Sequence, residues 1–351
     1  MTSDLSPQFD PVPVRREDVL DVGWLSSALS THHDGCRVSA VAIRARRTTV
    51  ASKDFVDVDF ANPGSPPAPG RLCIKAYFGE SRALSRAGES EARFYRDCAP
   101  STATRIPACS YVGLDEVSGS SILILEDLEG AGATPLDALS RFTPELSAAT
   151  LGQLARRHAE TWEHAGLYQP WLAPRMLSIS QNVSSEQLQT LLDRPRADGL
   201  SVATRTGSRV RAAMQVLGHM PEDSPRCMLH GDTHAGNIFD SPSGPGLLDW
   251  QLVQRGFWAT DVAYHIGSVL ETEDRRRSEW ELLRGYLDCL GELGVAAPPW
   301  ESAVTAYRQQ LAYGLFLWAM TQYTPEELTT ATLQRLGRAV EDHGTFELLG
   351  V

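Results

Sequence analysis

The spacing of apolar residues changes near residue 130, and this change most restricts the folds open to the chain. Before it, short runs such as "DFVDVDFA" and "RLCIKAYF" alternate or stay apolar, as β-strands do. After it, long stretches with helical spacing follow one another. They are interrupted once, by "RCMLHGD", "NIFD" and "GLLDWQ", which predict short strands with a hairpin. We therefore expect an α+β protein whose strand-rich part precedes a larger helical part.

The pattern also predicts individual elements. In the first part, helices are expected over residues 16–30 and 81–99, and strands over 37–45, 54–61, 71–78 and 121–128. The stretch "NPGSPPAPG" has the turn residues of a hairpin loop between the second and third strands. In the second part, helices are expected over 144–165, 184–194, 204–220, 275–293, 301–320 and 325–344.

Composition argues against several classes of protein. The chain has 32 Lys and Arg against 44 Asp and Glu, and the resulting net charge of −12 would repel nucleic acid and anionic membranes. No apolar run approaches the roughly 18 residues of a membrane helix, and the polar N-terminus lacks the apolar core of a secretion signal. Six scattered cysteines without a Cys-x-x-Cys pair indicate neither a zinc site nor disulfides. We expect a cytoplasmic protein that binds neither nucleic acid nor membrane; its protein partners are unknown.

The segment "MLHGDTHAGNIFD" concentrates residues that carry chemistry. Its residue types fit three interpretations: a metal site on His230, Asp232 and His234, a phosphoryl-transfer loop, or a polar turn. Five positions separate Asp232 from Asn237, as in a kinase catalytic loop, where the Asp orients the attacking hydroxyl and the Asn binds Mg²⁺. The hairpin is expected to bring Asp249 beside Asn237, which provides a carboxylate and an amide oxygen for that cation.

The chain contains only two lysines, Lys53 and Lys75, and nearly all of its other basic residues are arginines. A lysine at a given position is therefore informative. Lys75 lies in an apolar, strand-like run, where an ammonium group is costly unless it is paired and needed. Phosphoryl transfer requires a cation on the non-transferred phosphates and a partner that holds this cation. Lys75 and Glu91, which lies in the following predicted helix, can fill these two roles.

These segments together resemble the aminoglycoside phosphotransferase and choline kinase-like family of small-molecule kinases, whose fold is similar to that of protein kinases. "HGDTHAGN" followed by "LLDW" is similar to the catalytic and metal motifs of the family. "ESEARFY" after "CIKAYF" is similar to the E-x-x-F-Y helix of its ecdysteroid kinase-like (CHK-like) branch, and "LILEDL", "LARRHAETW" and "RGFWATDVAYHI" resemble further segments. The likeness extends from about residue 35 to about residue 325.

The resemblance implies a bilobal protein kinase-like fold. A small N-terminal antiparallel sheet lobe with one key helix would bind the nucleotide, and a larger, mainly helical C-terminal lobe would hold the catalytic loop, the metal site and the acceptor pocket. The implied boundaries are a leading segment over 1–34, an N-lobe over 35–125, a hinge over 126–133 and a C-lobe over 134–351.

The resemblance also implies roles for residues of the catalytic and metal motifs. Asp232 would be the catalytic aspartate, and His230 would complete the catalytic set by orienting its loop. Asn237 and Asp249 would bind Mg²⁺. Asp261 would brace the catalytic loop from the following helix.

A second group of residues is implied to bind the nucleotide. Lys75 would contact its α- and β-phosphates, with Glu91 as partner, and the backbone from Glu126 to Leu128 would meet the adenine. Because no G-x-G-x-x-G precedes Lys75, the phosphate-covering loop is expected in "RTTVASKDF", where Ser52 or Lys53 could serve.

Other polar and aromatic residues receive a structural interpretation. We expect His234 to be a polar loop residue and His158 and Trp162 to pack in the core. The same is expected of the aromatic and apolar stripe Tyr313, Phe316, Leu317, Trp318 and Tyr323.

The sequence predicts an ATP- and Mg²⁺-dependent phosphotransferase that moves the γ-phosphoryl group onto a hydroxyl of a small molecule, either an aminoglycoside or amino-sugar-like compound or a steroid-like alcohol. Two alternatives belong to other classes. One is a catalytically silent nucleotide-binding protein with a kinase fold. The other is a metal-dependent phosphoesterase. The segment "GDTH" superficially resembles a metal motif of such enzymes, although the chain lacks their further Asp-x-His and Gly-Asn-His motifs.

Overall fold

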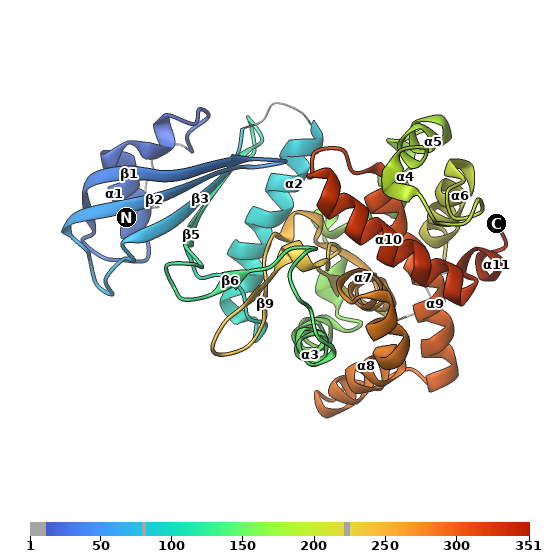
Figure 1. Ribbon diagram of the computed structural model, residues 1–351. Coiled ribbons are helices and arrows are strands. Elements are labelled where there is room, and N and C mark those ends of the chain that lie inside the picture. Colours follow the sequence, from blue (N-terminus) through green and yellow to red (C-terminus); the bar gives the residue numbers. More distant parts are fainter. Residues whose placement is uncertain (1–11, 79–81, 221–224) are drawn as a thin grey trace. The chain divides into compact units, whose positions relative to one another are not determined.

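The computed structural model describes residues 12–78, 82–220 and 225–351, without the side chains of 82–85 (Figure 1). The first eleven residues of the expected leading segment lie outside this description. The chain divides into two compact units. Unit 1 comprises Met1–Ser101 and Ile106–Ala133, and unit 2 comprises Thr102–Arg105 and Thr134–Val351.

Unit 1 is built on a five-stranded antiparallel sheet with the strand order β1-β2-β3-β5-β4. Its strands are β1 (Arg37–Thr48), β2 (Ser52–Asn62), β3 (Arg71–Tyr77), β4 (Cys109–Asp115) and β5 (Ser120–Glu126). The four strands expected from the sequence are confirmed. β4 was not expected, because "CSYVGLD" combines small and polar residues without clear alternation.

One face of this sheet packs against α1 (Val22–Ser30) (Figure 1). Its apolar cluster joins Trp24 and Leu25 of the helix to Leu72, Ile74 and other alternate strand residues, as the period of two in a strand requires. The leading helix begins at Val22 rather than at residue 16, because the carboxylate of Asp21 accepts a hydrogen bond from the Trp24 N–H at 2.8 Å and so caps the helix.

The other face carries Cys73, Lys75 and Tyr77 toward α2 (Arg82–Arg93), which continues as a π-helix over Phe94–Cys98. A glycine allows the helix to approach closely: a Cβ at Gly88 would lie 2.4 Å from the Ser121 Oγ. The two faces therefore differ in character, since one is an apolar core and the other presents a buried lysine to a helix.

Unit 2 is mainly helical. Its helices are α3 (Pro144–Thr161), α4 (Met176–Gln181), α5 (Ser185–Leu192), α6 (Gly207–Gly218), α7 (Ala259–Val269), α8 (Thr272–Glu292), α9 (Trp300–Met320), α10 (Glu326–His343) and α11 (Thr345–Leu349). Every residue of α7 is buried, and α7 packs against α3, α9 and α10 (Figure 1). A buried central helix can hold the groups of a site in fixed positions.

Short strands interrupt these helices, as the sequence predicted. β8 (Ile238–Asp240) and β9 (Gly246–Leu247) form the expected hairpin, to which β6 (Thr134–Pro135) adds a third strand. A separate ribbon pairs β7 (Arg226–Leu229) with β10 (Gln254–Phe257). The hairpin and the ribbon frame the segment that contains the catalytic motif.

A four-residue segment of unit 2, residues 102–105, interrupts unit 1 in the sequence. The carboxylate of Glu160 on α3 accepts hydrogen bonds from the Thr102 hydroxyl at 2.8 Å and the Ala103 N–H at 2.6 Å. The Gln153 side chain accepts one from the Arg105 N–H at 2.8 Å. The segment is thus fastened to α3 by polar contacts of its backbone and side chains.

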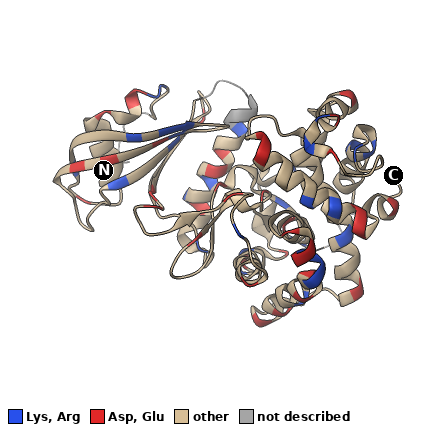
Figure 2. Ribbon diagram, in the orientation of Figure 1, with Lys and Arg blue, Asp and Glu red and all other residues tan. Residues whose placement is uncertain are grey.

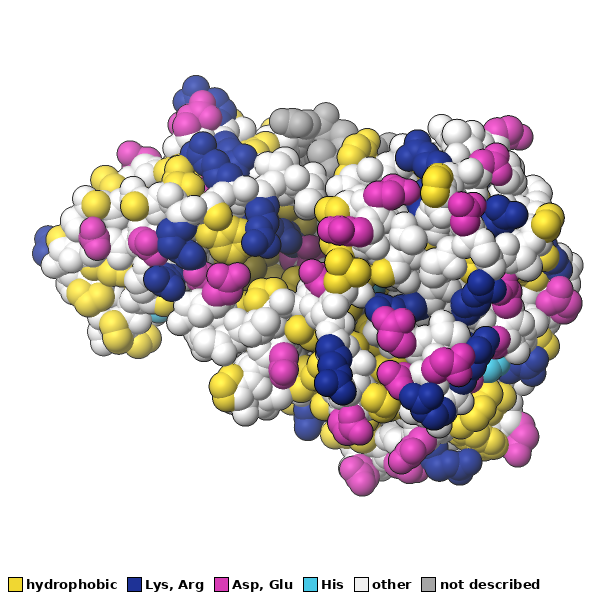
Figure 3. Space-filling view, in the orientation of Figure 1, with side chains coloured by type: hydrophobic (Ala, Val, Ile, Leu, Met, Phe, Trp, Pro, Cys, Tyr) yellow, Lys and Arg dark blue, Asp and Glu magenta, His cyan; other side chains and the backbone are white. Residues whose placement is uncertain are grey.

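Charged side chains of both signs are interspersed. They alternate along α8 and α10 (Figure 2), where Arg276 pairs with Asp342 at 2.8 Å and Arg275 with Glu279 at 2.6 Å. On the face shown in Figure 3, acidic and basic side chains mix within each unit. Within the described residues, no helix has the length and apolar character needed to span a membrane.

Candidate active site

Lys75 and Glu91 form a buried ion pair in unit 1. The Lys75 Nζ lies 2.6 Å from one Glu91 carboxylate oxygen and 2.8 Å from the other, and the two residues are 2% and 0% exposed. The hydroxyl of Tyr77, two residues along β3, donates to the same carboxylate at 2.8 Å. Charges taken out of water persist only when paired and hydrogen-bonded. The predicted partners are therefore brought together and held.

The strand register places further cations beside Lys75. Lys53 lies directly opposite Lys75, and Arg47 directly opposite Lys53, so their side chains leave the same face of the sheet. Ser52 pairs with Ala76 instead and points to the other face. Arg47, Lys53 and Lys75 therefore form a row of three basic side chains on one face of the sheet, in which the charge of Lys75 is matched by Glu91.

The segment expected to meet adenine, from Glu126 to Leu128, begins at the last residue of β5. The Glu126 N–H donates to the Ala108 carbonyl at 2.9 Å, and the Glu126 carboxylate accepts from the Ala108 N–H at 2.8 Å. The carbonyl of Leu128 accepts from the Ala133 N–H at 2.8 Å. Asp127, which is buried, pairs with Arg44. The backbone of this segment is therefore held from several sides.

The loop of unit 2 that follows β7 requires its glycine. Gly231 has φ +82°, and a Cβ at this position would lie 2.3 Å from the Leu252 carbonyl oxygen. Asp261 on α7 then fixes the loop, because its carboxylate accepts hydrogen bonds from the His230 N–H at 2.7 Å and the Gly231 N–H at 2.9 Å. The expected bracing by Asp261 is confirmed. His158, which the sequence analysis placed in the core, is buried and donates from Nε2 to Asp261 at 3.2 Å.

His230 links the loop to the segment that leads to Asp249. Its Nδ1 accepts from the Asp232 N–H at 3.2 Å, so Nε2 carries the proton and donates to the Leu248 carbonyl at 3.0 Å. Burial lowers the pKa of His230, which favours this neutral tautomer. The ring packs on Trp250 with the centroids 4.6 Å apart. These contacts support an orienting role and leave neither ring nitrogen for proton transfer.

The Asp232 side chain is 12% exposed. Its Oδ1 accepts from the Tyr264 hydroxyl at 3.0 Å and lies 3.7 Å from the His234 Nε2. Burial raises the pKa of Asp232, but the interaction with the imidazole of His234 outweighs this effect, so the pKa is lowered overall. Asp232 is therefore an ionised carboxylate able to accept a hydrogen bond from a hydroxyl.

The β8–β9 hairpin brings the backbone of Asn237 to Leu248, the residue before Asp249. The Leu248 N–H donates to the Asn237 carbonyl at 3.0 Å, and the Asn237 Nδ2 donates to the Asp232 carbonyl at 2.9 Å. This second bond fixes the amide orientation, which leaves Oδ1 as the atom available to a cation. Asp249 has φ 68°, a left-handed conformation that is unfavourable for a residue with a Cβ. An amide oxygen beside a carboxylate is a donor set that suits Mg²⁺.

The phosphoesterase alternative needs a larger ligand set. Across the described parts of the chain, no three His, Cys, Asp or Glu residues are grouped so that they could hold a metal ion. Two-metal hydrolases require several such ligands around each pair of ions. The residues near Asp232 fit a kinase loop better than a two-metal centre.

Aromatic residues around Asp232 were not identified as site residues from the sequence. The Trp318 Nε1 donates to the Tyr264 hydroxyl at 2.7 Å, and the Tyr313 hydroxyl donates to the Gly231 carbonyl at 2.7 Å. Tyr313 and Trp318 are buried as expected, but their polar atoms also support the loop. Tyr323, at 88% exposed beyond the end of α9, does not belong to the core, so that expectation was wrong. The helical spacing of Asp261 and Tyr264 is a signal that could have revealed Tyr264.

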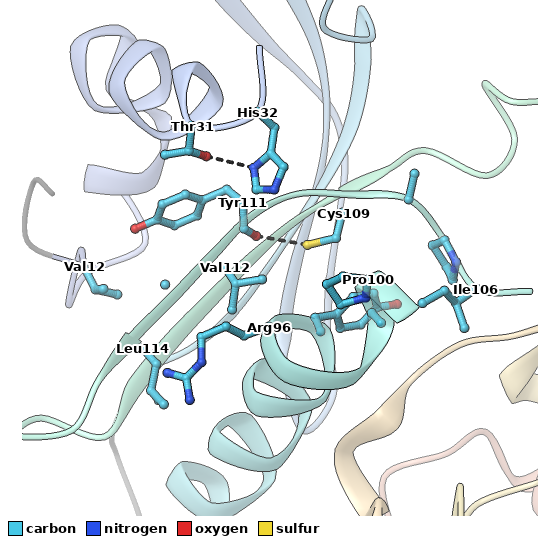
Figure 4. Close-up of a pocket in the computed structure, with 15 residues that line it drawn as sticks. Val12, Thr31, His32, Arg96, Pro100, Ile106, Cys109, Tyr111, Val112 and Leu114 are labelled. Carbon is cyan, nitrogen blue, oxygen red and sulfur yellow. Dashed lines mark hydrogen bonds between the residues drawn. The ribbon is translucent and has the colours of Figure 1, made fainter. Parts of the chain in front are cut away.

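Unit 1 also contains a cavity of about 690 Å³ beside β4 (Figure 4). Its walls come from the ends of α1 and the π-helix, the segment before β4, and β4 itself. Tyr111, Val112, Pro100 and Ile106 make much of its lining apolar. None of the residues that line it is among the predicted site residues.

A model of a phosphotransferase enzyme family matches residues 68–299, more than half of the chain. The chain belongs to this family. No curated protein matches the phosphotransferase significantly. Three of the solved structures that share its fold illustrate the likeness. The first, from Ralstonia eutropha JMP134, is assigned as an aminoglycoside phosphotransferase (TM-score 0.54, 15% identity, covering 92% of this chain and 98% of the other).

The second is a microcompartment-associated aminopropanol kinase (TM-score 0.54, 14% identity, 93% and 98% covered). The third is the choline kinase LicA of Streptococcus pneumoniae (TM-score 0.51, 14% identity, 88% and 94% covered). The family and the kinase-like α+β fold expected from the sequence are confirmed. So is the enzyme class: the phosphotransferase is a small-molecule kinase.

Proposed function

We propose that this protein transfers the γ-phosphoryl group of ATP, with Mg²⁺, to a hydroxyl group of a small molecule. The arrangement around Asp232 supports the proposal most directly. An ionised carboxylate is held in a loop whose backbone is fixed by Asp261, and Asn237 and Asp249 provide oxygen donors next to it. Positioning and electrostatic stabilisation supply most of the catalysis in phosphoryl transfer, and this loop is built for both.

The proposed roles in unit 2 are divided among three side chains. Asp232 accepts a hydrogen bond from the acceptor hydroxyl and orients its oxygen toward the phosphorus. Asn237 Oδ1 and the Asp249 carboxylate would hold Mg²⁺, which when bound neutralises charge on the phosphate oxygens. His230 keeps the loop and the Asp249 segment in register through its two ring nitrogens.

In unit 1, the proposed site is the face of the sheet that carries Lys75. Lys75, fixed by Glu91, would contact the α- and β-phosphates, and Lys53 on the adjacent strand would add a second cation. The backbone from Glu126 to Leu128 would meet the adenine. A neighbouring structure of LicA was solved in complex with AMP, which supports a nucleotide ligand for this fold (TM-score 0.51). We retain the N-lobe over 35–125, the hinge over 126–133 and the C-lobe over 134–351 as functional divisions.

The proposed acceptor is a hydroxyl compound, and two classes are to be compared: aminoglycosides with other amino sugars, and larger apolar alcohols such as steroids. The experiment measures ADP release from Mg·ATP across these classes, with choline-like alcohols, macrolides and a water-only control. Asp232→Asn and Asp249→Ala are assayed beside the wild type.

We expect one acceptor class to raise the rate in the wild type. Asp232→Asn should lower kcat by about 1000-fold, as the loss of a general base does. Asp249→Ala should abolish Mg·ATP turnover. If no acceptor and no background turnover is seen, and ATP does not raise the Tm, the catalytically silent nucleotide-binding alternative replaces this proposal.

A further inference from the structure

We propose that Tyr264 is a positioning residue that reserves one oxygen of the catalytic carboxylate, so that the other receives the acceptor proton. The inference rests on the proposed function. It concerns a residue on α7 whose hydroxyl touches Asp232 and which the motifs of the loop do not include.

The direction of the hydrogen bonds follows from the chemistry of the groups. The Trp318 Nε1–H can only donate, so at 2.7 Å it uses a lone pair of the Tyr264 hydroxyl. The Tyr264 proton is then directed to the Asp232 Oδ1, 3.0 Å away. An indole N–H, a phenol and a carboxylate thus form a chain of hydrogen bonds with one polarity, in which each bond strengthens the next.

Packing holds this chain in place. Tyr264 is fully buried on a helix whose residues are all buried, and Trp318 is buried on α9, which packs against α7. Gly314 on α9 leaves room for the tyrosine ring, because a Cβ at this position would lie 2.6 Å from the Tyr264 Cδ2. The phenol cannot turn away from the carboxylate without repacking two helices.

The consequence concerns the two oxygens of Asp232. Oδ1 accepts the Tyr264 hydroxyl and also lies nearer to His234, at 3.7 Å from its Nε2. Oδ2 is therefore the oxygen that receives the acceptor proton. In that step the acceptor oxygen forms a bond to the γ-phosphorus, the bond from this phosphorus to the β-γ bridging oxygen breaks with its electron pair leaving on ADP, and the acceptor proton moves to Oδ2. Tyr264 keeps its own proton throughout.

The test compares Tyr264→Phe with a matched control, Tyr307→Phe. Tyr307 is a fully buried tyrosine on α9 whose hydroxyl donates to the Glu279 carboxylate at 2.9 Å, in the same unit but in a cluster that includes no predicted site residue. Both substitutions remove a phenol hydroxyl from a buried carboxylate, and both are expected to lower the Tm by a few degrees. Only Tyr264→Phe should lower kcat, by about 10- to 100-fold, as a misplaced catalytic group does.

The readouts separate positioning from general damage. The KM for ATP should stay within about twofold in both variants, because Tyr264 touches no proposed nucleotide contact. Trp318→Phe removes the donor behind Tyr264 but leaves the phenol, so its loss of kcat should be smaller than that of Tyr264→Phe.

Two outcomes overturn the inference while the proposed function stands. In the first, the wild type is active and the kcat of Tyr264→Phe lies within twofold of the wild-type kcat. In the second, Tyr307→Phe loses as much kcat as Tyr264→Phe. A wild type that releases no ADP with any acceptor or with water overturns the proposed function, and the positioning role with it.

Discussion

The two units stabilise a buried charge in different ways. In unit 1, the Lys75 ammonium pairs with the Glu91 carboxylate at 2.6 Å, and the Tyr77 hydroxyl donates to the same carboxylate. In unit 2, within the described residues, no arginine or lysine pairs with the Asp232 carboxylate. A phenol and, at longer range, an imidazole face it, and the backbone of its loop is tied to Asp261.

The two arrangements have different consequences for the stability of the protein and for the positions of its catalytic atoms. An ion pair makes each partner dependent on the other, since an isolated buried charge is very costly. A loop held by directed hydrogen bonds depends instead on many weak contacts that fix atoms in place. We therefore expect substitutions around Lys75 to act on stability and nucleotide binding, whereas substitutions around Asp232 should lower turnover as well as stability.

Among the substitutions that test this comparison, Asp261→Ala should give the largest effect, because it removes the acceptor of the His230 and Gly231 N–H groups. We expect kcat to fall at least about 100-fold and the free energy of unfolding to fall by about 3–5 kcal/mol. Steady-state kinetics and urea unfolding measure the two quantities. Asp261→Asn, which retains one acceptor oxygen, should lose less of both. A normal kcat in Asp261→Ala would show that the loop does not depend on this brace.

Glu91→Gln should destabilise the protein by about 3 kcal/mol, because it removes the carboxylate charge that lies 2.6 Å from the buried Lys75 ammonium. The double variant Lys75→Met/Glu91→Gln should recover much of this loss, since no isolated charge remains. It should not recover nucleotide affinity, which can be followed by the ATP-induced rise in Tm. If both variants unfold at the same urea concentration, the contrast between the units is wrong.

His265 on α7 provides a pH-dependent test of the hydrogen-bonded unit. Burial lowers the pKa of His265 from 6.5 to about 4; its Nδ1 donates to the Thr233 carbonyl at 3.2 Å. Because the unfolded chain takes up this proton below pH 6.5 and the folded chain does not, stability is present above pH 6.5 and is lost as the pH falls toward 4.

The expected loss from this histidine is about 2 kcal/mol between pH 7 and pH 5. His265→Asn retains a donor for Thr233 but does not titrate, so its unfolding free energy should fall less steeply over this interval. Parallel pH profiles of the two proteins would contradict the assignment.

Lys53→Gln should have the smallest effect, a rise of about three- to tenfold in the KM for ATP, because it removes one cation of the row that contains Lys75. Arg46→Gln is the control. Arg46 lies opposite Asp54, whose side chain leaves the other face of the sheet from Lys75, and should change this KM by less than twofold. Equal effects would indicate a general influence of charge rather than a contact with phosphate.

Patterns of local spacing predicted the elements well. Four strands of unit 1, the β8–β9 hairpin and the six long helices are visible in the sequence because their periodicity is strong. β4, β6, β10, α4 and α11 were not predicted, because short or weakly patterned segments gain their structure from neighbours. The start of α1 was misplaced because the capping role of Asp21 outweighs the apolar spacing that precedes it.

The part of the candidate site that lies within short sequence motifs could be predicted from the sequence. The motif residues from His230 to Asp249 come together through one local hairpin. Tyr264 and Trp318 could not be found in this way, since their contact with Asp232 depends on how α7 and α9 pack, and buried aromatic residues are usually core. That Lys53, and not Ser52, leaves the face of the sheet that carries Lys75 likewise depends on the strand register.

The segment 102–105 affects how this protein can be recombined with its relatives. A single breakpoint at the end of unit 1, after Ala133, would transfer these four residues together with unit 1 and separate them from Gln153 and Glu160 of α3, with which they bond. A chimaera would then combine a segment from one parent with a helix from the other. Successful exchanges of the first unit should therefore retain Gln153 and Glu160, or move all of these residues together.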